Sequence, residues 1–150
     1  MAQIIPAGKY YIRCAAFTDR VAEVYEAVPE PNIPIVGFPL DKQPEEQWHV
    51  ETIPGQALQV IRSELTTPDD RPLYWAEPVV RAMPEPVVVN LFPMRFSIEP
   101  AGKVGNVETY RVHDPSRDLV ATLLDGDEMA QIFLAKWRGD NTQKWFFESA

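Results

Sequence analysis

The side chains that most often carry out chemistry in proteins are few in this chain and lie far apart. It has two histidines, His49 and His113, and one cysteine, Cys14. Neither histidine lies near a nucleophile motif, and the two do not have the spacing of metal ligands. The adjacent carboxylates Glu45-Glu46 and Asp69-Asp70 are typical of surface charge, and the seven glycines form no phosphate-binding cluster. We therefore expect no enzyme, no metal site and no bound cofactor.

The composition argues against several classes of partner. With a formal net charge of −8, the chain lacks the clustered Lys and Arg that bind nucleic acid or anionic membranes. Its N-terminal segment does not have the pattern of a signal peptide, and no stretch approaches about 18 consecutive apolar residues. A lone cysteine allows no intrachain disulfide, and its alternation with Ile12 predicts that Cys14 is buried. We expect a monomeric cytoplasmic protein that binds neither nucleic acid nor membrane.

A period of 49 residues runs through the whole chain. Three arginines mark it, each in a short strand-like stretch that follows a glycine: Arg13, Arg62 and Arg111. Each unit closes on a second stretch centred on an aromatic residue: Trp48, Phe96 and Trp145. A period of roughly 20 to 50 residues indicates an architecture built from equivalent units. We therefore divide one domain, residues 1–150, into three repeats of about 49 residues, approximately 7–53, 54–103 and 104–150.

Each repeat contains four segments with the alternation or short apolar run of a β-strand, bounded by turn-forming residues. The 12 predicted strands are Tyr10–Ala15, Val21–Ala27, Ile33–Leu40, Trp48–Ile53, Leu58–Ser63, Pro72–Ala76, Val87–Phe92, Phe96–Glu99, Glu108–His113, Leu119–Leu124, Met129–Trp137 and Lys144–Glu148. Fifteen prolines argue against long helices. Three four-strand units around a pseudo-threefold axis can form a six-stranded barrel capped by three hairpins. The sequence therefore predicts an all-β protein with a β-trefoil fold. A propeller usually needs more blades, and an immunoglobulin-like sandwich shows no such triplication.

The ends of the repeats carry a family resemblance. Gln143-Lys144-Trp145 matches the Gln-x-Trp motif of ricin-B-type lectins, and Glu46-Gln47-Trp48 and Met94-Arg95-Phe96 are eroded forms of it. The opening segments Ala7–Ile12 and Ala16–Val21 resemble the first repeat of small mushroom β-trefoil proteins. That group includes ricin-B-like lectins, cospin-like serine protease inhibitors and the more distant mycocypins. The resemblance covers essentially the whole chain and implies either protease inhibition or sugar binding.

The first candidate site is the proline-rich loop Val28–Pro34, between the second and third strands. Its prolines stiffen the segment, which lowers the entropy cost of entering a protease cleft. In cospin-like inhibitors the trypsin-binding loop lies here and has an asparagine at its tip, so the resemblance points to Asn32. The predicted protease-binding residues are Pro29, Glu30, Pro31, Asn32 and Ile33. Trypsin prefers Lys or Arg, so Asn32 rests on the resemblance alone. The alternative interpretation of the loop is a well-anchored turn.

The equivalent loop of the second repeat, Pro78–Pro86, is a second candidate. It carries Arg81, followed by Ala82 and Met83. A long cationic side chain among small and apolar residues suits a trypsin-like pocket, through a charge-assisted pair at the pocket's base. The alternative interpretation is a solvated arginine at a hairpin tip. A third exposed loop, Lys136–Asn141, is a weaker candidate because it lacks proline.

Sugar binding is the alternative function. It needs a carboxylate or amide for the sugar hydroxyls and an aromatic platform for the apolar sugar face. In the first repeat, Phe38 and Pro39 occupy positions where polar residues would be expected, although Asp19 remains. The second repeat offers Asp69, Asp70, Arg71, Tyr74 and Trp75, and the third offers Asp114, Arg117, Asp118 and Trp137. We expect an inhibitor of trypsin-like serine proteases, with a defensive role implied by the resemblance, and a ricin-B-like lectin as the alternative.

Overall fold

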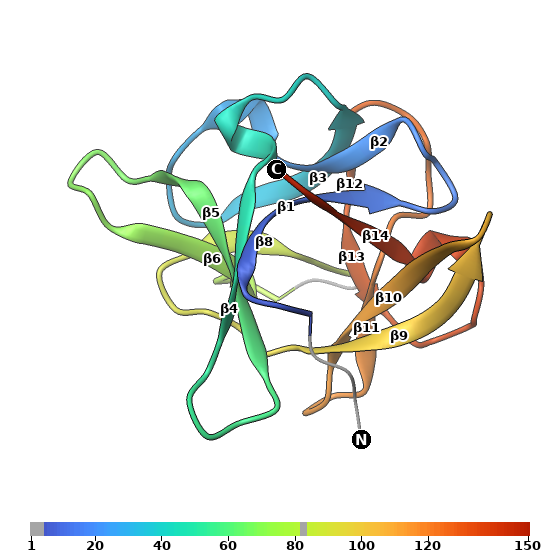
Figure 1. Cartoon of the computed structure of the whole chain (residues 1–150). Coiled ribbons are helices and arrows are strands. Elements are labelled where there is room, and N and C mark those ends of the chain that lie inside the picture. The colour runs from blue at the N-terminus through green and yellow to red at the C-terminus, as the bar shows by residue number, and fades with distance from the viewer. Residues whose placement is uncertain (1–4, 82–83) are drawn as a thin grey trace.

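The regular structure of the protein consists mainly of β-strands, which form one continuous sheet (Figure 1). The computed structural model describes residues 5–81 and 84–150. Its strands are β1 (Gly8–Cys14), β2 (Arg20–Val24), β3 (Ile33–Pro39), β4 (Trp48–Thr52), β5 (Gln59–Thr66), β6 (Pro72–Ala76), β7 (Glu85–Pro86), β8 (Val88–Asn90), β9 (Ser97–Val104), β10 (Val107–Asp114), β11 (Leu119–Thr122), β12 (Ala130–Gln131), β13 (Phe133–Ala135) and β14 (Trp145–Ser149). Three short 3-10 helices join them: η1 (Tyr25–Ala27), η2 (Pro44–Glu46) and η3 (Asn141–Gln143). Within residues 5–81 and 84–150, no helix is long and apolar enough to cross a membrane.

Six strands form a closed antiparallel barrel. β1 pairs with β4 and β14, β10 pairs with β14 and β9, and β4 pairs with β5. The barrel closes where β5 meets the start of β9, because the backbones of Gln59 and Phe96 exchange two hydrogen bonds of 2.8 Å. Closure removes the unpaired edges that an open sheet would leave.

Three two-stranded hairpins complete the fold. The second strand of each hairpin, which is the third strand of its repeat, lies against the others around a pseudo-threefold axis. The hairpins are β2–β3, β6–β8 and β11–β13. Three backbone hydrogen bonds form a ring between them: Ile35 N–H donates to Val87 O at 3.0 Å, Val87 N–H to Ile132 O at 2.9 Å, and Ile132 N–H to Ile35 O at 2.9 Å. These residues therefore occupy equivalent positions in the three repeats. A barrel with a triplet of hairpins is a β-trefoil, as the sequence predicted.

The described part of the chain has 14 strands where the sequence predicted 12. Each predicted strand is present, but Met129–Trp137 is divided into β12 and β13, and the short strand β7 precedes β8. Both breaks fall at residues of the ring, Ile132 and Val87. Their N–H groups bond across the axis to the next repeat and not to their own hairpin partner. The predicted strand Val21–Ala27 ends early, at Val24, because Glu26 and Ala27 have φ values of 50° and 57°.

Large aromatic side chains fill the core. Trp48, Phe96 and Trp145 point inward from the closing stretch of each repeat and are fully buried, as predicted. The indole N–H groups of Trp48 and Trp145 donate to the carbonyls of Ala22 and Ala121, at 2.9 and 3.1 Å. Cys14 is also fully buried.

The second repeat builds the same core differently. It has the smaller Phe96 as its closing ring and adds Trp75 from β6, which packs edge-on against Trp48 and Phe96 with ring centroids 5.8 and 6.0 Å apart. Trp75 is fully buried, so its proposed role as a sugar platform is wrong. A large ring from β6 is needed here because phenylalanine fills less of the barrel than tryptophan.

The recurring arginines make equivalent ion pairs on the barrel surface. Each one contacts a glutamate on the adjacent barrel strand: Arg13 with Glu148 at 2.6 Å, Arg62 with Glu51 at 3.1 Å, and Arg111 with Glu99 at 2.6 Å. The 49-residue period therefore reflects a cross-strand pair that the fold repeats three times. Only in the third repeat does this pair extend into the candidate site described below.

Candidate functional site

Comparing two equivalent positions across the three repeats shows which repeat has both an acidic and an aromatic residue. The strand registers place Val21 opposite Phe38, Tyr74 opposite Asn90, and Val120 opposite Ala135. Two residues before these second-strand residues, the first, second and third repeats have Asp19, Pro72 and Asp118, respectively. Two residues after the third-strand partners, the three repeats have Leu40, Phe92 and Trp137, respectively. The first repeat thus has an acid without a ring, the second has a ring without an acid, and the third has both.

In the third repeat these two residues line one open hollow of about 630 Å³. Its walls are formed by Arg111, Arg117, Asp118, Lys136 and Trp137. The side chain of Asp118 is 88% exposed, and Trp137 is 38% exposed. The hollow therefore presents an aromatic surface, a carboxylate acceptor and cationic donors to solvent.

A chain of polar contacts connects the acid to the ring. Asp118 Oδ1 lies 2.7 Å from His113 Nε2, and His113 Nδ1 lies 3.0 Å from Glu99 Oε2. Arg111 Nε donates to Glu99 Oε1 at 2.6 Å, and its guanidinium lies 5.1 Å from the centre of the Trp137 ring. This last contact is a cation–π interaction. These contacts connect Asp118 and Trp137 to residues of the strands β9 and β10.

Glu99 is the central acceptor of this network. Burial acts to raise the pKa of its carboxyl, but hydrogen bonds from Ser97, Arg111 and His113 together lower that pKa below its ordinary value. Glu99 therefore stays ionised and holds the donors in place. Sequence reasoning did not find this role, although Arg111 and His113 alternate along one face of β10, which is a readable signal.

Asp114 and Arg117, which the sequence suggested as ligand-binding residues, are both engaged in contacts within the protein. Asp114 is buried, and it accepts hydrogen bonds from Ser116 and from Arg117, whose Nε lies 2.9 Å away. Arg117 also pairs with Glu85 at 2.6 Å. Asp114 therefore shapes the turn before β11 and does not face a ligand. Arg117 is held by these two carboxylates at the wall of the hollow.

One candidate acid in each of the other two repeats forms an ion pair with an arginine close to it in the chain. Asp19 pairs with Arg20 at 3.0 Å, and Asp69 pairs with Arg71 at 2.9 Å. Phe92 is 84% exposed, so the second repeat has an accessible ring. Its position equivalent to Asp118 is Pro72, which offers no acceptor in its side chain.

The proline-rich loop is tied to the neighbouring repeat. Ile33 pairs with Val89, and Asn32 N–H donates to Val89 O at 2.7 Å. Asn32 has a φ of 69°, and its Oδ1 accepts a hydrogen bond from Val79 N–H at 2.9 Å. Glu30, Pro31 and Asn32 are exposed, while Pro29 and Ile33 are half-buried. The side chain at the loop tip is thus used to bind the second candidate loop.

The second candidate loop is partly described. Arg81 is exposed and pairs with Glu77 at 3.1 Å and with Glu85 at 3.9 Å. Val79 and Val80 are 73% and 77% exposed. Ala82 and Met83, which were also predicted to contact a protease, lie outside the described residues.

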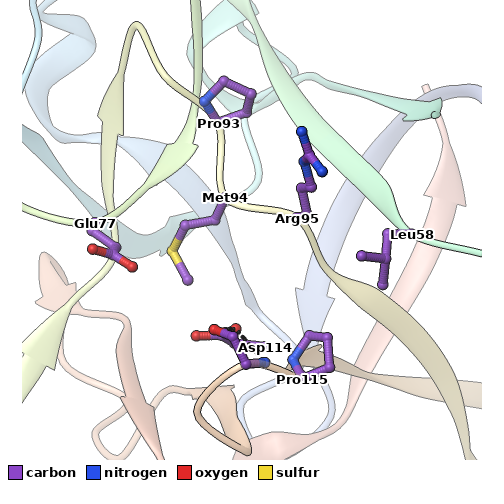
Figure 2. Close-up of a pocket in the computed structure, with 8 residues that line it drawn as sticks. Leu58, Glu77, Pro93, Met94, Arg95, Asp114 and Pro115 are labelled. Carbon is purple, nitrogen blue, oxygen red and sulfur yellow. Dashed lines mark hydrogen bonds between the residues drawn. The ribbon is translucent and has the colours of Figure 1, made fainter. Parts of the chain in front are cut away.

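A second hollow, of about 300 Å³, lies between the second and third repeats. Figure 2 shows the Met94 side chain extending toward Asp114, with the Arg95 guanidinium pointing away from it. The residues that line it are Leu58, Glu77, Pro93, Met94, Arg95, Asp114, Pro115 and Ser116, none of them aromatic. Asp114 accepts hydrogen bonds within its own turn, and this hollow has no aromatic lining residue, unlike the hollow beside Trp137.

The comparisons with known proteins bear on the fold. No protein-family model matches the chain. The Rhizoctonia solani agglutinin is similar over 100% of both chains, with a TM-score of 0.81 and 12% identity. The Macrolepiota procera ricin B-like lectin, solved in complex with lactose, is similar over 99% of both chains, with a TM-score of 0.75 and 18% identity. A designed threefold-symmetric protein, ThreeFoil, has a TM-score of 0.78 at 11% identity over 95% of this chain and 99% of its own. These likenesses establish a β-trefoil fold for the chain.

Proposed function

We propose that this chain binds carbohydrate through the hollow of its third repeat. The observation that carries the proposal is the joint presence of Asp118 and Trp137 at equivalent positions that the other repeats fill incompletely. The similarity to an agglutinin and to a lectin solved with lactose supports the same reading. The alternative drawn from the sequence thus has more support than protease inhibition. The proposal is for binding without turnover.

The residue types match the chemistry of a sugar. One face of a pyranose ring presents C–H groups, which pack against an aromatic surface such as Trp137. The Asp118 side chain can accept hydrogen bonds from two neighbouring hydroxyls, and Lys136 can donate to a ring or hydroxyl oxygen. His113 acts as a positioning residue, because it holds Asp118 and does not itself line the hollow.

A glycan array followed by calorimetry tests the proposal. Lactose is the first probe, because the Macrolepiota lectin was solved with it. Trp137→Ala is expected to weaken binding about tenfold or more, since a lost aromatic contact costs roughly 0.5–1.5 kcal/mol beyond its buried area. Asp118→Asn is expected to weaken binding as well, because it replaces a charged acceptor with a neutral one.

The threefold symmetry supplies matched controls. Phe92→Ala and Asp19→Asn change equivalent exposed residues in the other repeats and should leave glycan binding unchanged. If no glycan binds, or if the controls weaken binding as much as Trp137→Ala does, the third-repeat site is wrong.

Protease inhibition remains a second candidate because of one observation. The Asn32–Val79 hydrogen bond joins the two candidate loops into one surface, on which Val79 and Val80 are strongly exposed. Titration against trypsin, chymotrypsin and papain tests this, with Arg81→Ala compared to the exposed control Arg95→Ala. If the loop enters the protease, Arg81→Ala should weaken inhibition about tenfold, as expected for loss of a charge-assisted pair. Absence of inhibition at micromolar protein would exclude this function.

A further inference from the structure

The first repeat contains buried acids at two positions where the third repeat has a neutral hydrogen-bonded pair. In the third repeat, Gln143 is fully buried. Its Nε2 donates to Lys136 O at 2.7 Å and to Thr122 Oγ1 at 3.2 Å, and its Oε1 accepts from Arg138 N–H at 2.6 Å. The aligned Gln-x-Trp motifs make Glu46 the counterpart of Gln143.

The strand registers identify the second position. Glu23 pairs with Val36, the residue after Ile35, and Thr122 pairs with Phe133, the residue after Ile132. Since Ile35 and Ile132 are equivalent, Glu23 is the counterpart of Thr122. A glutamine–threonine hydrogen bond in one repeat is therefore replaced by two glutamates in another.

One carboxylate oxygen of Glu46 accepts hydrogen bonds as the Gln143 side-chain oxygen does, whereas the other has no such partner. Glu46 Oε1 accepts from the N–H groups of Asp41 and Lys42 at 2.9 and 3.0 Å, as Gln143 Oε1 accepts from Arg138. Glu46 Oε2 takes the place of a donor amide, and it is buried with no hydrogen-bond partner in the described part of the chain. A buried acceptor of this kind lacks the donor or cation that would satisfy it.

The Glu23 carboxylate faces two further acids. Glu23 is 3% exposed, and within residues 5–81 and 84–150 no hydrogen bond or ion pair to its carboxylate is formed. Carboxylate oxygens of Glu23, Asp41 and Glu45 all lie within 4.8 Å of one another. Asp41 is exposed and Glu45 half-buried, so the group opens to solvent on one side.

The geometry of this cluster favours a positive charge at its centre. Glu23 is 3% exposed, and its carboxylate lies beside those of Asp41 and Glu45. A buried carboxylate without a counter-charge has lost hydration that a bound cation would replace.

We propose that Glu23, Asp41 and Glu45 bind a divalent cation of the calcium type, close to the buried carboxylate of Glu46. The donors are all oxygens, with no nitrogen or sulfur, which suits hard cations. Oxygens bound to one Ca²⁺ at about 2.3–2.6 Å can lie up to roughly 5 Å apart, whereas the shorter bonds of Mg²⁺ require a tighter group. The sequence analysis predicted no metal site, because Glu23 comes from β2 and the other acids come from the segment around η2.

Calcium titration of the whole protein tests the proposal directly. At pH 8 we expect saturable Ca²⁺ binding by calorimetry and a rise in the unfolding midpoint, since a ligand that binds only the folded state stabilises it. Tb³⁺ provides a second signal. Its luminescence should be sensitised by Trp48, whose indole bonds to the carbonyl of Ala22, next to Glu23 in the chain, and Ca²⁺ should displace it.

The third repeat shows how to remove the site without disturbing the fold. The double variant Glu23→Thr/Glu46→Gln gives the first repeat the threonine–glutamine pair that Thr122 and Gln143 form in the third. It should fold while binding Ca²⁺ at least about tenfold more weakly. Asp41→Asn/Glu45→Gln removes the more accessible acids and gives an independent reading if the first variant is unstable. Glu108→Gln, on the exposed part of β10, is the matched control and should bind like the wild type.

Two results would overturn the proposal. One is the absence of any heat or midpoint shift up to about 10 mM Ca²⁺, well above the range of weak calcium modules. The other is equal binding by the wild type and both double variants, which would locate the ion elsewhere on this acidic protein.

Discussion

At the scale of single residues, the three repeats solve the same packing problem with different side chains. Trp48 and Trp145 fill the barrel and bond through their indole N–H groups to strand carbonyls. Trp75 fills the space beside the smaller Phe96, and its indole Nε1 is buried without a partner in the described part of the chain. The three tryptophans are therefore equally buried, but only two of their indole N–H groups have an acceptor in the described part of the chain. The sequence could show that these rings are large and apolar, but not which of them had a carbonyl within reach.

This difference predicts unequal costs for the same substitution. Trp48→Phe leaves the Ala22 carbonyl without its donor, whereas Trp75→Phe removes a donor that has no acceptor. Both variants lose similar volume, so the cavity term is comparable. We expect Trp48→Phe to lower the free energy of unfolding by about 1–3 kcal/mol more than Trp75→Phe. Urea unfolding at one pH measures both, and equal losses would mean that the indole hydrogen bond contributes little.

At the scale of elements, the strands were predictable and the loops were not. Alternation and turn residues located every strand except the two-residue β7, because each barrel strand must bury one face and expose the other. The proline-rich loop was recognised as stiff, but its partner was not foreseen. Asn32 bonds to Val79, which is distant in sequence, and only the ring of third strands brings the two loops together.

The candidate sugar site shows the same limit. Asp118 and Trp137 were both named from their residue types, yet Trp75 was named on equal grounds and is buried. What separates them is the strand that carries them. Trp137 follows β13 at a position where the chain leaves the sheet, and Trp75 lies inside β6 on the face toward the barrel. Composition alone cannot make that distinction.

At the scale of the whole molecule, the backbone follows threefold symmetry, but the side chains at equivalent positions form different contacts in the three repeats. The three Arg–Glu pairs are geometrically equivalent, but only the pair of Arg111 and Glu99 continues through His113 to a candidate binding residue. Likewise, one repeat keeps the neutral Gln143–Thr122 pair and another replaces it with acids. Comparing positions across the repeats therefore separates what the fold requires from what a ligand could use.

The unequal pairs predict an unequal response to acid. The pKa of Glu99 is lowered in the folded protein, so its stabilisation is present above the ordinary carboxyl value of 4.5 and is lost as the pH falls through the lower folded value. Glu99→Gln should therefore reduce the free energy of unfolding at pH 7 by about 1–3 kcal/mol, as expected for hydrogen bonds to a charged group. The difference from wild type should shrink as the pH falls through the lowered pKa of the folded wild-type carboxyl, because that carboxylate then becomes protonated as well.

Glu148→Gln is the matched control, because Glu148 pairs with Arg13 at the equivalent place on the barrel. Its side chain is 46% exposed, against 21% for Glu99, so solvent screens the pair and the variant should lose less than about 1 kcal/mol. Urea unfolding of the three proteins from pH 3 to pH 7 measures these differences. Parallel stability curves for wild type and Glu99→Gln, or an equal loss in Glu148→Gln, would contradict the prediction. Either result would mean that the greater burial of the Glu99 network adds nothing to the free energy of unfolding.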